Sequence, residues 1–351
     1  MAFNFPRKTV YLISPDPKKI EGLELAWKNL KILSGKSSPY LRAAKTKGAD
    51  IEFLGLSQHK TTADLLQNTS VQKRIRRGSR LLVFKNLPKV EKIAEKYGWQ
   101  LLMPKAKFIN LLEDKINFVK FCHEYDLPLL TSQVVVLNRV KFSKPIVVQL
   151  RRGHAGESTY FVKSAKDLSI LQKTTGEWTV KITPLKKLPT FSLNLCVGQS
   201  QTYSTQPFFQ ITGDPRLNPL PGGTGGIDFD IADKILNNIL QEKISNLVEK
   251  IGSALRRSGY RGIAGIDFLA DTTTKKIHLI ELNPRLLSNL GFVTKLQKMT
   301  GETPLLTIHL LELLGIDTCN LDFHKISQVK KGRFELPHQN VKIHQTNRLN
   351  T

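Results

Sequence analysis

Two neighbouring segments, GIAGIDFLAD (262–271) and KIHLIELNP (276–284), decide how this chain folds. Both are apolar runs typical of β-strands, and the threonines at 272–274 between them predict a tight turn. The second run ends in an acid and an amide, and a guanidinium follows one residue later. Charged groups rarely enter an apolar strand without a partner, so we expect this hairpin to carry the function.

A hairpin that is symmetric about residue 274 places Asp267 directly opposite Glu281. Directly opposed residues share one face of the sheet, with Cβ atoms about 4.5–5.5 Å apart, and Asn283 points to the same face. Two carboxylates this close repel each other, which raises their pKa values. A divalent cation removes the repulsion, and two acids with an amide suit Mg²⁺ or Mn²⁺. We therefore predict that Asp267, Glu281 and Asn283 bind a metal.

Arg285 follows this set directly, and its guanidinium can bind a phosphate group through two parallel hydrogen bonds. A second interpretation stays open, in which Arg285 or a nearby lysine neutralises the two acids as a structural ion pair. Both interpretations place Arg285 beside the acids of the hairpin.

Short apolar runs alternate with helical segments over about the first hundred residues, which predicts a parallel α/β domain. No glycine-rich dinucleotide fingerprint follows the first strand, where SPDPKK (14–19) stands instead. The pattern then predicts a small α+β unit and a larger one. The expected strands are 9–14, 49–56, 79–85, 99–104, 134–137, 145–150, 160–163, 178–182, 191–197 and 207–212, and the expected helices are 89–98, 112–125, 165–173, 230–258 and 303–315.

The spacing GIDFLAD–x₉–ELNPR resembles the ATP-grasp superfamily, in which an acid on one strand and E-x-N-x-R on the next hold magnesium and a triphosphate. The resemblance covers about residues 79–315. It implies an α/β chain with the ATP-grasp fold, built from an N-terminal pre-ATP-grasp parallel α/β domain, a small α+β lid domain and a C-terminal α+β domain that holds the metal site. The corresponding ranges are 1–108, 109–185 and 186–325, and a polar tail occupies 326–351.

The segment LLEDKINFVKFCHEYDLPL (111–129) resembles the helix that opens the ATP-binding region of these proteins. The resemblance gives Lys115 the position of the lysine that touches the nucleotide phosphates. Together with Arg285, Lys115 is then expected to neutralise the phosphoryl group that is transferred. Taken alone, Lys115 is an ordinary solvated lysine on a helix.

The segment PIVVQLRRGHAGESTYFVK (145–163) resembles the strand, glycine-rich loop and strand that fold over the phosphates. Backbone N–H groups in such a loop can bind phosphate oxygens as an anion-binding nest. The expected phosphate-binding positions are Gly153, His154, Ala155 and Gly156.

Gln149 departs from the family, because most ATP-grasp enzymes have lysine at that position. A neutral amide replaces only part of a missing charge. Arg151 lies two residues on and shares a face of the strand with Gln149, whereas Arg152 points elsewhere. Arg151 is therefore our hypothesis for the displaced cation at the nucleotide phosphates.

The segment WTVKITPL (178–185) resembles the hinge between the lobes, where backbone groups meet the adenine edge and apolar side chains cover the ring. Lys181 and Ile182 are the candidates for these contacts. The segment 208–229 resembles the strand and loop that border the second substrate, with Gln210 and the glycines of 222–226 as candidate lining residues. The resemblance does not identify that substrate.

The resemblance implies an ATP-dependent ligase of the carboxylate–amine type. Such enzymes use ATP to convert a carboxylate into an acyl phosphate, release ADP, and let an amine or another nucleophile displace phosphate. The expected cofactors are ATP and Mg²⁺ or Mn²⁺, and the expected substrates are small molecules or peptides. The reaction requires no side-chain nucleophile, and no serine, histidine or cysteine stands in a pattern that would activate one.

A formal net charge of +24 is the unusual feature of the composition. Such a surface can attract RNA or acidic substrates. Its densest cluster, VQKRIRRGSR (71–80), has no interleaved aromatic residues for base stacking. An RNA-associated protein is therefore an alternative that we do not favour. Gln149 motivates a second alternative, a nucleotide-binding protein that has lost catalysis.

The chain carries no sign of membrane insertion or export. No apolar run approaches the roughly 18 residues of a membrane-spanning helix, and the first residues lack a cleavable signal pattern. Cys122, Cys196 and Cys319 lie far apart without a CxxC motif, which favours reduced thiols. We therefore expect a cytoplasmic protein without a membrane partner, and the sequence does not indicate its oligomeric state.

Overall fold

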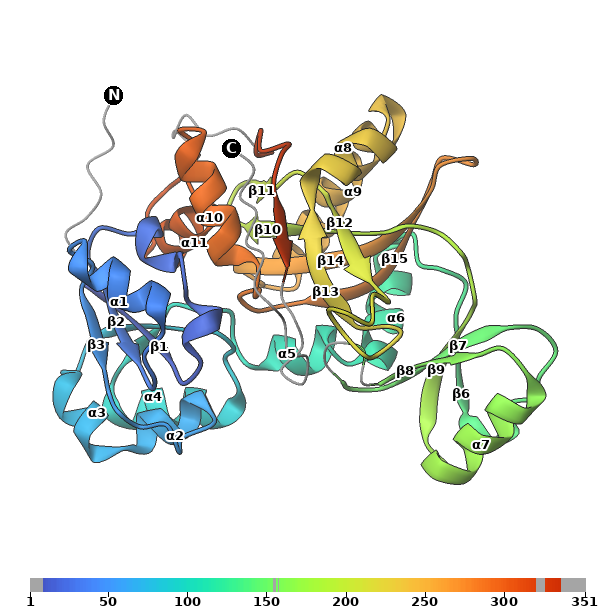
Figure 1. Ribbon diagram of the computed structural model, residues 1–351, viewed down its shortest axis with the longest axis horizontal. Coiled ribbons are helices and arrows are strands. Elements are labelled where there is room, and N and C mark those ends of the chain that lie inside the picture. Colours follow the sequence, from blue (N-terminus) through green and yellow to red (C-terminus); the bar gives the residue numbers. More distant parts are fainter. Residues whose placement is uncertain (1–8, 154–155, 157, 320–325, 336–351) are drawn as a thin grey trace.

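The computed structural model of the chain describes residues 9–153, 156, 158–319 and 326–335. Three β-sheets follow one another along the sequence. The first and the second sheet lie at opposite ends of the molecule, and the third lies between them (Figure 1). None of the helices in the described ranges is long and apolar enough to span a membrane.

The N-terminal sheet is parallel throughout and is surrounded by helices. Its elements are β1 (Val10–Ser14), β2 (Leu30–Ser34), α1 (Pro39–Thr46), β3 (Ile51–Phe53), α2 (Thr62–Gln67), α3 (Thr69–Arg74), β4 (Arg80–Val83), α4 (Pro88–Tyr97) and β5 (Gln100–Leu101). The strand order β3-β2-β1-β4-β5 confirms the parallel α/β domain that the alternating pattern predicts. Strand β2, a short buried run beside β1, was not predicted.

Two helices, α5 (Lys107–Leu112) and α6 (Lys115–Glu124), connect the first sheet to the second. The sequence predicted a helix over 112–125, which corresponds to α6, and did not predict α5; Glu113 and Asp114 separate the two helices. The Asp114 carboxylate accepts hydrogen bonds from two backbone N–H groups in the first turn of α6, at 3.0 and 3.1 Å, and so caps that helix. As a result, Lys115 is the first residue of α6.

The second sheet forms a small unit with one helix, which we call the lid (residues 133–184). Its elements are β6 (Gln133–Val136), β7 (Ile146–Leu150), β8 (Thr159–Val162), α7 (Ala165–Thr175) and β9 (Thr179–Pro184). The sheet is antiparallel in the order β6-β9-β7-β8. One face packs under α7 in a core that includes Val148, Val180 and Ile182. The opposite face carries Gln149 and Lys181, which pair across β7 and β9.

The third sheet is antiparallel and holds the predicted hairpin. Its elements are β10 (Thr190–Val197), β11 (Thr202–Ser204), β12 (Phe208–Thr212), β13 (Thr224–Asp228), α8 (Phe229–Ile235), α9 (Asn238–Arg257), β14 (Gly262–Asp271), β15 (Lys276–Asn283), α10 (Leu290–Met299), α11 (Leu305–Leu313) and β16 (Arg333–Glu335). The strand order is β15-β14-β10-β12-β13-β16, with β11 beside β10. The helix predicted over 230–258 is two helices, because Asn237 interrupts it and caps α9.

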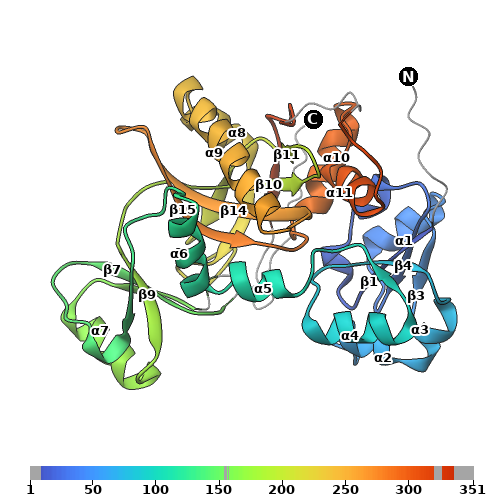
Figure 2. The same cartoon turned by 180° about the vertical axis from the view of Figure 1, so that it is seen from behind.

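The two faces of the third sheet have different roles. Helices α6 and α9 pack on one face (Figure 2) and share its apolar core. On β14, Ile266 and Phe268 enter this core, while Asp267 between them points to the other face. Asp267 of the predicted site therefore lies on the face that α6 and α9 leave uncovered.

Part of the predicted polar tail belongs to the third sheet. Strand β16 pairs with β13, and Val329 is 3% exposed in a small core beside Phe334. Residues 336–351 of that tail lie outside the described residues. Each sheet falls within one of the three predicted domain ranges, apart from β16, and the boundaries at 108, 185 and 325 stay a proposal.

Candidate functional site

The hairpin of β14 and β15 brings the two predicted acids together. Asp267 pairs with Glu281. Close to the turn, however, Asp271 pairs with Lys276, so the hairpin is not symmetric about residue 274 as the prediction assumed. A bulge in β15 at Ile280 supplies the extra residue between these two registers.

This bulge decides which way Glu281 points. Leu279 of β15 enters the apolar core, so strict alternation would send Glu281 into the core as well. The extra residue at Ile280 shifts the alternation by one position. Glu281 and Asn283 therefore share the polar face with Asp267, as the sequence predicted, whereas a regular strand continued from the register near the turn would not place them there.

Asp267 is held by neutral donors. Its Oδ1 atom accepts hydrogen bonds from Ser192 Oγ and from Gln210 Nε2, the latter at 2.7 Å. Burial, and after it the neighbouring Glu281 carboxylate, raise the pKa of Asp267 to about 7. Without a bound metal this carboxyl group therefore keeps its proton up to a higher pH than an ordinary aspartate does.

Glu281 is paired with a buried lysine. Lys115 Nζ lies 3.4 Å from Glu281 Oε2, and the Lys115 side chain is 5% exposed. Burial by itself would raise the pKa of Glu281, but Lys115, Asn283 and Arg285 outweigh it and lower that pKa. Glu281 is thus the charged member of the two acids, and Lys115 is a buried site residue rather than a solvated helix lysine.

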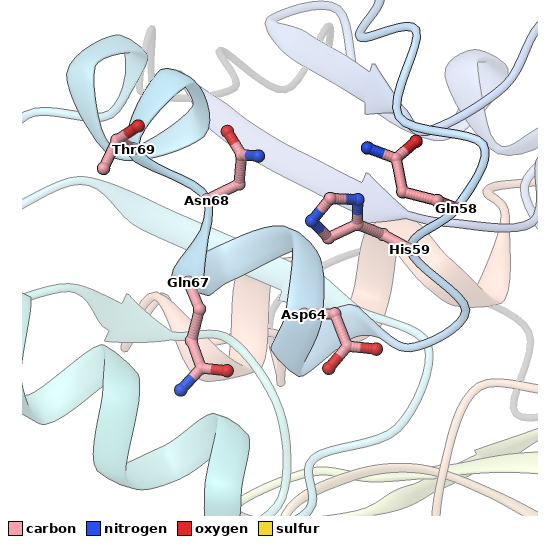
Figure 3. A pocket seen from close by; sticks show the side chains of 6 residues that line it. All are labelled: Gln58, His59, Asp64, Gln67, Asn68 and Thr69. Atoms are coloured by element: carbon pink, nitrogen blue, oxygen red, sulfur yellow. The ribbon is translucent and has the colours of Figure 1, made fainter.

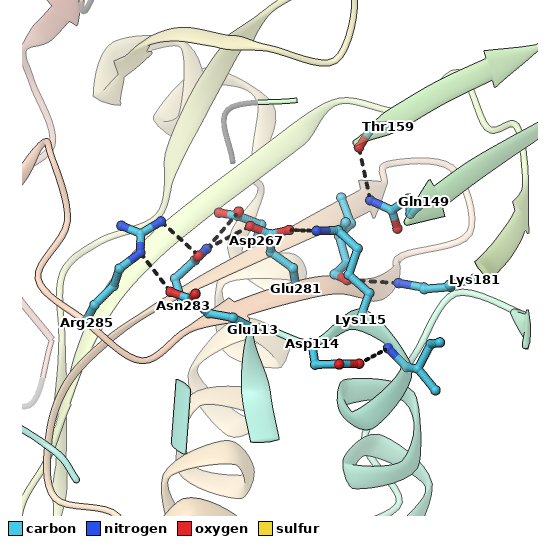
Figure 4. Close-up of polar contacts among 12 residues, drawn as sticks. Glu113, Asp114, Lys115, Gln149, Thr159, Lys181, Asp267, Glu281, Asn283 and Arg285 are labelled. Atoms are coloured by element: carbon cyan, nitrogen blue, oxygen red, sulfur yellow. Dashed lines mark hydrogen bonds and ion pairs between the residues drawn. The ribbon is translucent and has the colours of Figure 1, made fainter. Parts of the chain in front are cut away.

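Arg285 binds an acid from outside the hairpin. Its Nε atom donates to Glu113 Oε1 and its Nη2 atom donates to Asn283 Oδ1, each at 3.0 Å. Lys85 forms a second ion pair with Glu113. The ion pairs around the hairpin thus include Lys115 with Glu281 and Arg285 with Glu113 (Figure 4).

The three predicted metal ligands fit a hard divalent cation, which prefers carboxylate and amide oxygens. The Asn283 side-chain nitrogen lies between the two carboxylates, 3.0 Å from Glu281 Oε1 and 3.5 Å from Asp267 Oδ2. A bound cation would take the place of this NH₂ group. Rotation of the Asn283 amide by about 180° would then direct its carbonyl oxygen toward the cation. In the described part of the chain, no three His, Cys, Asp or Glu side chains form a separate metal cluster.

Two glycines of the lid loop are held where no side chain fits. A Cβ atom on Gly153 would lie 1.9 Å from Ser158 Oγ. Gly156 has a φ of 87°, and a Cβ atom there would lie 2.6 Å from the backbone of Gly222 and Gly223. The lid loop therefore touches the glycine-rich loop of the third sheet. The other two predicted positions of the lid loop lie outside the described residues: His154 and Ala155.

Gln149 and Arg151 have separate surroundings. Gln149 is 7% exposed, and its Nε2 atom donates to Thr159 Oγ1 at 3.4 Å. The Nε and Nη2 atoms of Arg151 both lie 2.8 Å from Asp114 Oδ2, and the Arg151 side chain is 53% exposed. Arg151 thus ties the lid to the cap of α6, and among the described residues it forms no hydrogen bond or ion pair with the acids of the hairpin.

Lys181 and Ile182 lie inside β9 rather than at a free strand edge. Both have register partners in β6 on one side and in β7 on the other. Their backbone groups are therefore directed at neighbouring strands, and the Ile182 side chain packs into the lid core. These positions do not suit the adenine contacts that the sequence predicted for them.

The Lys181 side chain reaches the hairpin instead. It is 1% exposed, and its Nζ atom donates to the backbone carbonyl of Ile280 at 3.0 Å. Ile280 is the bulged residue, one position before Glu281. Burial lowers the pKa of Lys181 to about 8, although the Glu281 carboxylate acts in the opposite direction.

Glu113, Lys85 and Ser192 belong to the site but were not predicted. Ser192 had a signal in the sequence, because Ser192 and Asn194 alternate with apolar residues along β10 and so mark a face outside the core. Glu113 and Lys85 had no such signal. Glu113 binds both Lys85 and Arg285, and Arg285 is 172 residues away from Glu113 in the sequence.

A separate polar pocket of about 520 Å³ lies in the N-terminal domain, beside helices α2 and α3 (Figure 3). The Asp64 carboxylate forms part of the N-terminal cap of α2, and the Asn68 side chain caps α3. These polar groups therefore serve the local fold. The lining residues, none of which was predicted as a site residue, are Gln58, His59, Asp64, Gln67, Asn68 and Thr69.

No protein-family model and no curated protein matches this sequence. Solved structures do match the fold. The N5-carboxyaminoimidazole ribonucleotide synthetase of Thermus thermophilus has a TM-score of 0.63 and 15% identity, over 93% of this chain and 81% of that one. Biotin carboxylase from Campylobacter jejuni, solved as a β,γ-ATP complex, has a TM-score of 0.65 and 14% identity, over 88% of this chain and 71% of that one.

A third similar structure contains a nucleotide with magnesium. It is the biotin carboxylase domain of the 2-oxoglutarate carboxylase of Hydrogenobacter thermophilus, in complex with MgADP, ADP and bicarbonate. The TM-score is 0.66 at 14% identity, over 93% of this chain and 73% of that one. At these identities the likeness establishes the fold and not the reaction.

Proposed function

We propose that this chain, an α/β protein with the ATP-grasp fold, is an ATP-dependent ligase that joins a carboxylate to an amine or another nucleophile. The terminal phosphoryl group of ATP passes to the carboxylate, ADP leaves, and the nucleophile then displaces phosphate from the acyl phosphate. The observation that carries this proposal is the hairpin cluster, in which Asp267, Glu281 and Asn283 meet beside Lys115 and Arg285.

The cluster offers both a metal site and cations for the phosphates. Asp267, Glu281 and Asn283 would hold Mg²⁺ or Mn²⁺, which supplies positive charge to the nucleotide when it is bound. With a cation on Glu281, the ammonium of Lys115 can turn from that acid to a phosphate oxygen. Arg285 is already oriented by its bond to Glu113. These groups would neutralise the charge of the phosphoryl group in transfer.

The lid loop would protect the reaction from water. Its backbone N–H groups at Gly153 and Gly156, with His154 and Ala155 in the same proposal, would bind phosphate oxygens. The contact between Gly156 and the glycine-rich loop 222–226 supports closure over the phosphates. A closed loop would shield the acyl phosphate from hydrolysis.

The adenine ring would lie against the lid face that carries Lys181. Ile182 points into the lid core, so it cannot cover the ring. Val147 and Phe161 pair with each other across β7 and β8, and Val147 lies two residues from Gln149 on the same face. Those two side chains are therefore the apolar surface that we propose for the ring.

The second substrate would bind beside Gln210. Gln210 Nε2 donates to Asp267, and Gln210 Oε1 accepts a hydrogen bond from Thr224 at 3.1 Å. Gln210 thus links the acids of the hairpin to the glycine-rich loop of the third sheet. Small-molecule or peptide carboxylates and amines are the substrate classes that we propose for this position.

The test is a screen for ADP release in the presence of Mg²⁺, with amino acids, dipeptides and polyamines as substrate pairs. We expect ADP and phosphate as products for a successful pair. The Glu281→Gln variant should be inactive, and a control at an exposed acid of α9, Glu242→Gln, should behave as the wild type. AMP with pyrophosphate as the main product would contradict the acyl-phosphate route.

The same screen addresses the alternative that Gln149 motivates. A protein that binds ATP but releases no ADP with any substrate pair would be a nucleotide-binding protein without catalysis. ATP binding measured in parallel by calorimetry separates that result from a failure to bind ATP at all.

A further inference from the structure

Lys181 is a buried cation with few partners. An ammonium group has three N–H donors. Among the described residues, Lys181 makes one hydrogen bond, to Ile280 O, and forms no ion pair; its Nζ atom also lies 5.9 Å from the ring centre of Phe118. The side chain is 1% exposed, so water does not replace the missing acceptors. Burying a charge in this way is costly unless an anion joins it.

The location of Lys181 indicates which anion. Lys181 lies directly opposite Gln149 across β7 and β9, so both side chains leave the lid on the same face. Its ammonium reaches the carbonyl one residue before Glu281, while Lys115 reaches Glu281 from α6. Two buried lysines from different elements therefore flank the same acid (Figure 4).

We propose that Lys181 is a phosphate-binding residue of the nucleotide site, whose ammonium leaves the Ile280 carbonyl and binds a phosphate oxygen of ATP. The lysine on β9 thereby supplies the charge that Gln149 on β7 does not. This inference rests on the proposed nucleotide site and deepens it. It replaces Arg151 in that role, because Arg151 is bound to Asp114 on the cap of α6.

A purely structural role explains Lys181 less well. If Lys181 served only to tie the lid to β15, a neutral donor would make the same hydrogen bond to Ile280 O without burying a charge. Glutamine is such a donor. Substitution by glutamine therefore distinguishes a lysine kept for its hydrogen bond from a lysine kept for its charge.

The experiment measures nucleotide binding to the full chain by calorimetry, with a non-hydrolysable ATP analogue and Mg²⁺, and adenosine binding by competition. For Lys181→Gln we expect the affinity for the analogue to fall about 10- to 100-fold, the usual effect of losing a charge-assisted hydrogen bond. Adenosine lacks phosphates, so its affinity should change by less than about twofold. Lys166→Gln, at an exposed lysine of α7, is the matched control and should change neither.

A second variant, in which the lysine and the glutamine exchange positions, tests the proposal without relying on Lys181→Gln alone. The double variant Lys181→Gln with Gln149→Lys moves the lysine across the strand pair to the facing position on the same side of the lid. We expect it to bind the ATP analogue within about fivefold of the wild type. This variant keeps the net charge, so it still decides the question if Lys181→Gln alone does not fold.

Three results would overturn the proposal. The first is an unchanged affinity of Lys181→Gln for the ATP analogue. The second is an equal loss for the analogue and for adenosine together with a lower melting temperature, which indicates a structural role. The third is a swap variant that folds but binds the analogue at least tenfold more weakly than the wild type. Failure of the proposed function looks different, because the wild type itself would then bind no ATP or release no ADP.

Discussion

The hairpin and the lid turn ionisable side chains of opposite sign toward the same space. On the hairpin, Asp267 and Glu281 face each other, and burial with this repulsion raises the pKa of Asp267 to about 7. In the lid, Lys181 stands opposite a neutral Gln149, and burial lowers its pKa to about 8. Asp267 therefore carries less negative charge, and Lys181 less positive charge, than the same side chains would in water. A bound ligand of the opposite sign would restore each charge.

This difference explains why one ligand can suit both regions. A complex of a divalent cation with a triphosphate brings positive charge to the hairpin and negative charge to the lid. The lid already touches the hairpin through Lys181 on the Ile280 carbonyl, and it touches the connection between β12 and β13 through Gly156 on Gly222 and Gly223. Binding of such a complex would therefore favour the closed arrangement of lid and hairpin.

The largest effect is expected on the hairpin side, from Glu281→Gln. This change removes a proposed metal ligand and leaves Lys115 buried without its partner. We expect turnover to fall by more than about 100-fold, measured as ADP release at saturating Mg²⁺. Thermal unfolding followed by circular dichroism would check that the variant folds. Activity near that of the wild type would remove the metal assignment.

The second prediction concerns Asp267 and the stability of the metal-free protein. Its pKa is about 7 in the folded protein and 3.8 ordinarily. Between about pH 4 and pH 7 the folded protein therefore binds more protons at this site than the unfolded chain, so the free energy of unfolding falls as the pH rises. Asp267 is partly exposed, and solvent screening reduces the expected loss to on the order of 1–3 kcal/mol.

Chemical denaturation at a series of pH values measures this effect. Asp267→Asn should be less sensitive to pH over that range, because the amide does not titrate. Added Mg²⁺ should also suppress the loss in the wild type, since a bound cation stabilises the charged carboxylate. An equal pH dependence in the wild type and in Asp267→Asn would show that Asp267 titrates normally.

The same comparison shows what the sequence could and could not predict. The pairing of Asp267 with Glu281 was predicted because the two strands are neighbours in the sequence and a short turn limits their register. The bulge at Ile280 was not predicted, although two successive apolar residues, Leu279 and Ile280, interrupt the alternation of β15 just before Glu281. The face of Glu281 was predicted from a register symmetric about residue 274, which pairs Asp267 with Glu281 as the bulged hairpin does.

In the lid, the pairing of Lys181 with Gln149 could not be predicted from the pattern of residues within either strand. Lys181 faces Gln149 only because β9 lies between β6 and β7, so the sheet order departs from the sequence order. Arg151 was preferred from alternation along β7, but the strand ends at Leu150 and Asp114 binds the guanidinium. Contacts between segments far apart in the chain therefore decide the arrangement on the lid side of the site.

The third prediction tests the contact that the lid makes at Gly156 with Gly222 and Gly223 of the third sheet's β12–β13 connection. The change Gly156→Ala strains a backbone with φ of 87° and directs a methyl group into the backbone of Gly222 and Gly223. We expect the KM for ATP to rise about tenfold and the free energy of unfolding to fall by about 1 kcal/mol. Gly176→Ala is the matched control, because Gly176 has φ of 72° and no atom within 4 Å of an added Cβ. It should share the loss of stability but leave KM unchanged.

The smallest effect is expected on the lid side, as proton uptake when the nucleotide binds. Glu281, Lys115 and Cys122 are the ionisable groups around Lys181; the first favours its charged form, and burial, the stronger influence, opposes it. At pH 8 about half of the Lys181 side chains are then protonated in the free protein, and a bound phosphate would return the pKa toward its ordinary 10.5. Binding of the ATP analogue should therefore take up about half a proton at pH 8 and almost none at pH 6.5.

Calorimetry in buffers of different ionisation enthalpy measures this number directly. Lys181→Gln should abolish the uptake at pH 8, whereas Lys166→Gln should retain it. Metal binding at the hairpin would release protons instead of taking them up, because a metal displaces a proton from Asp267. The titration is therefore done with Mg²⁺ already present and above pH 7.5, where Asp267 is mostly ionised. Proton release at pH 8 under these conditions would mean that Lys181 does not become protonated when the phosphates bind. Only the acids of the hairpin would then respond to the ligand.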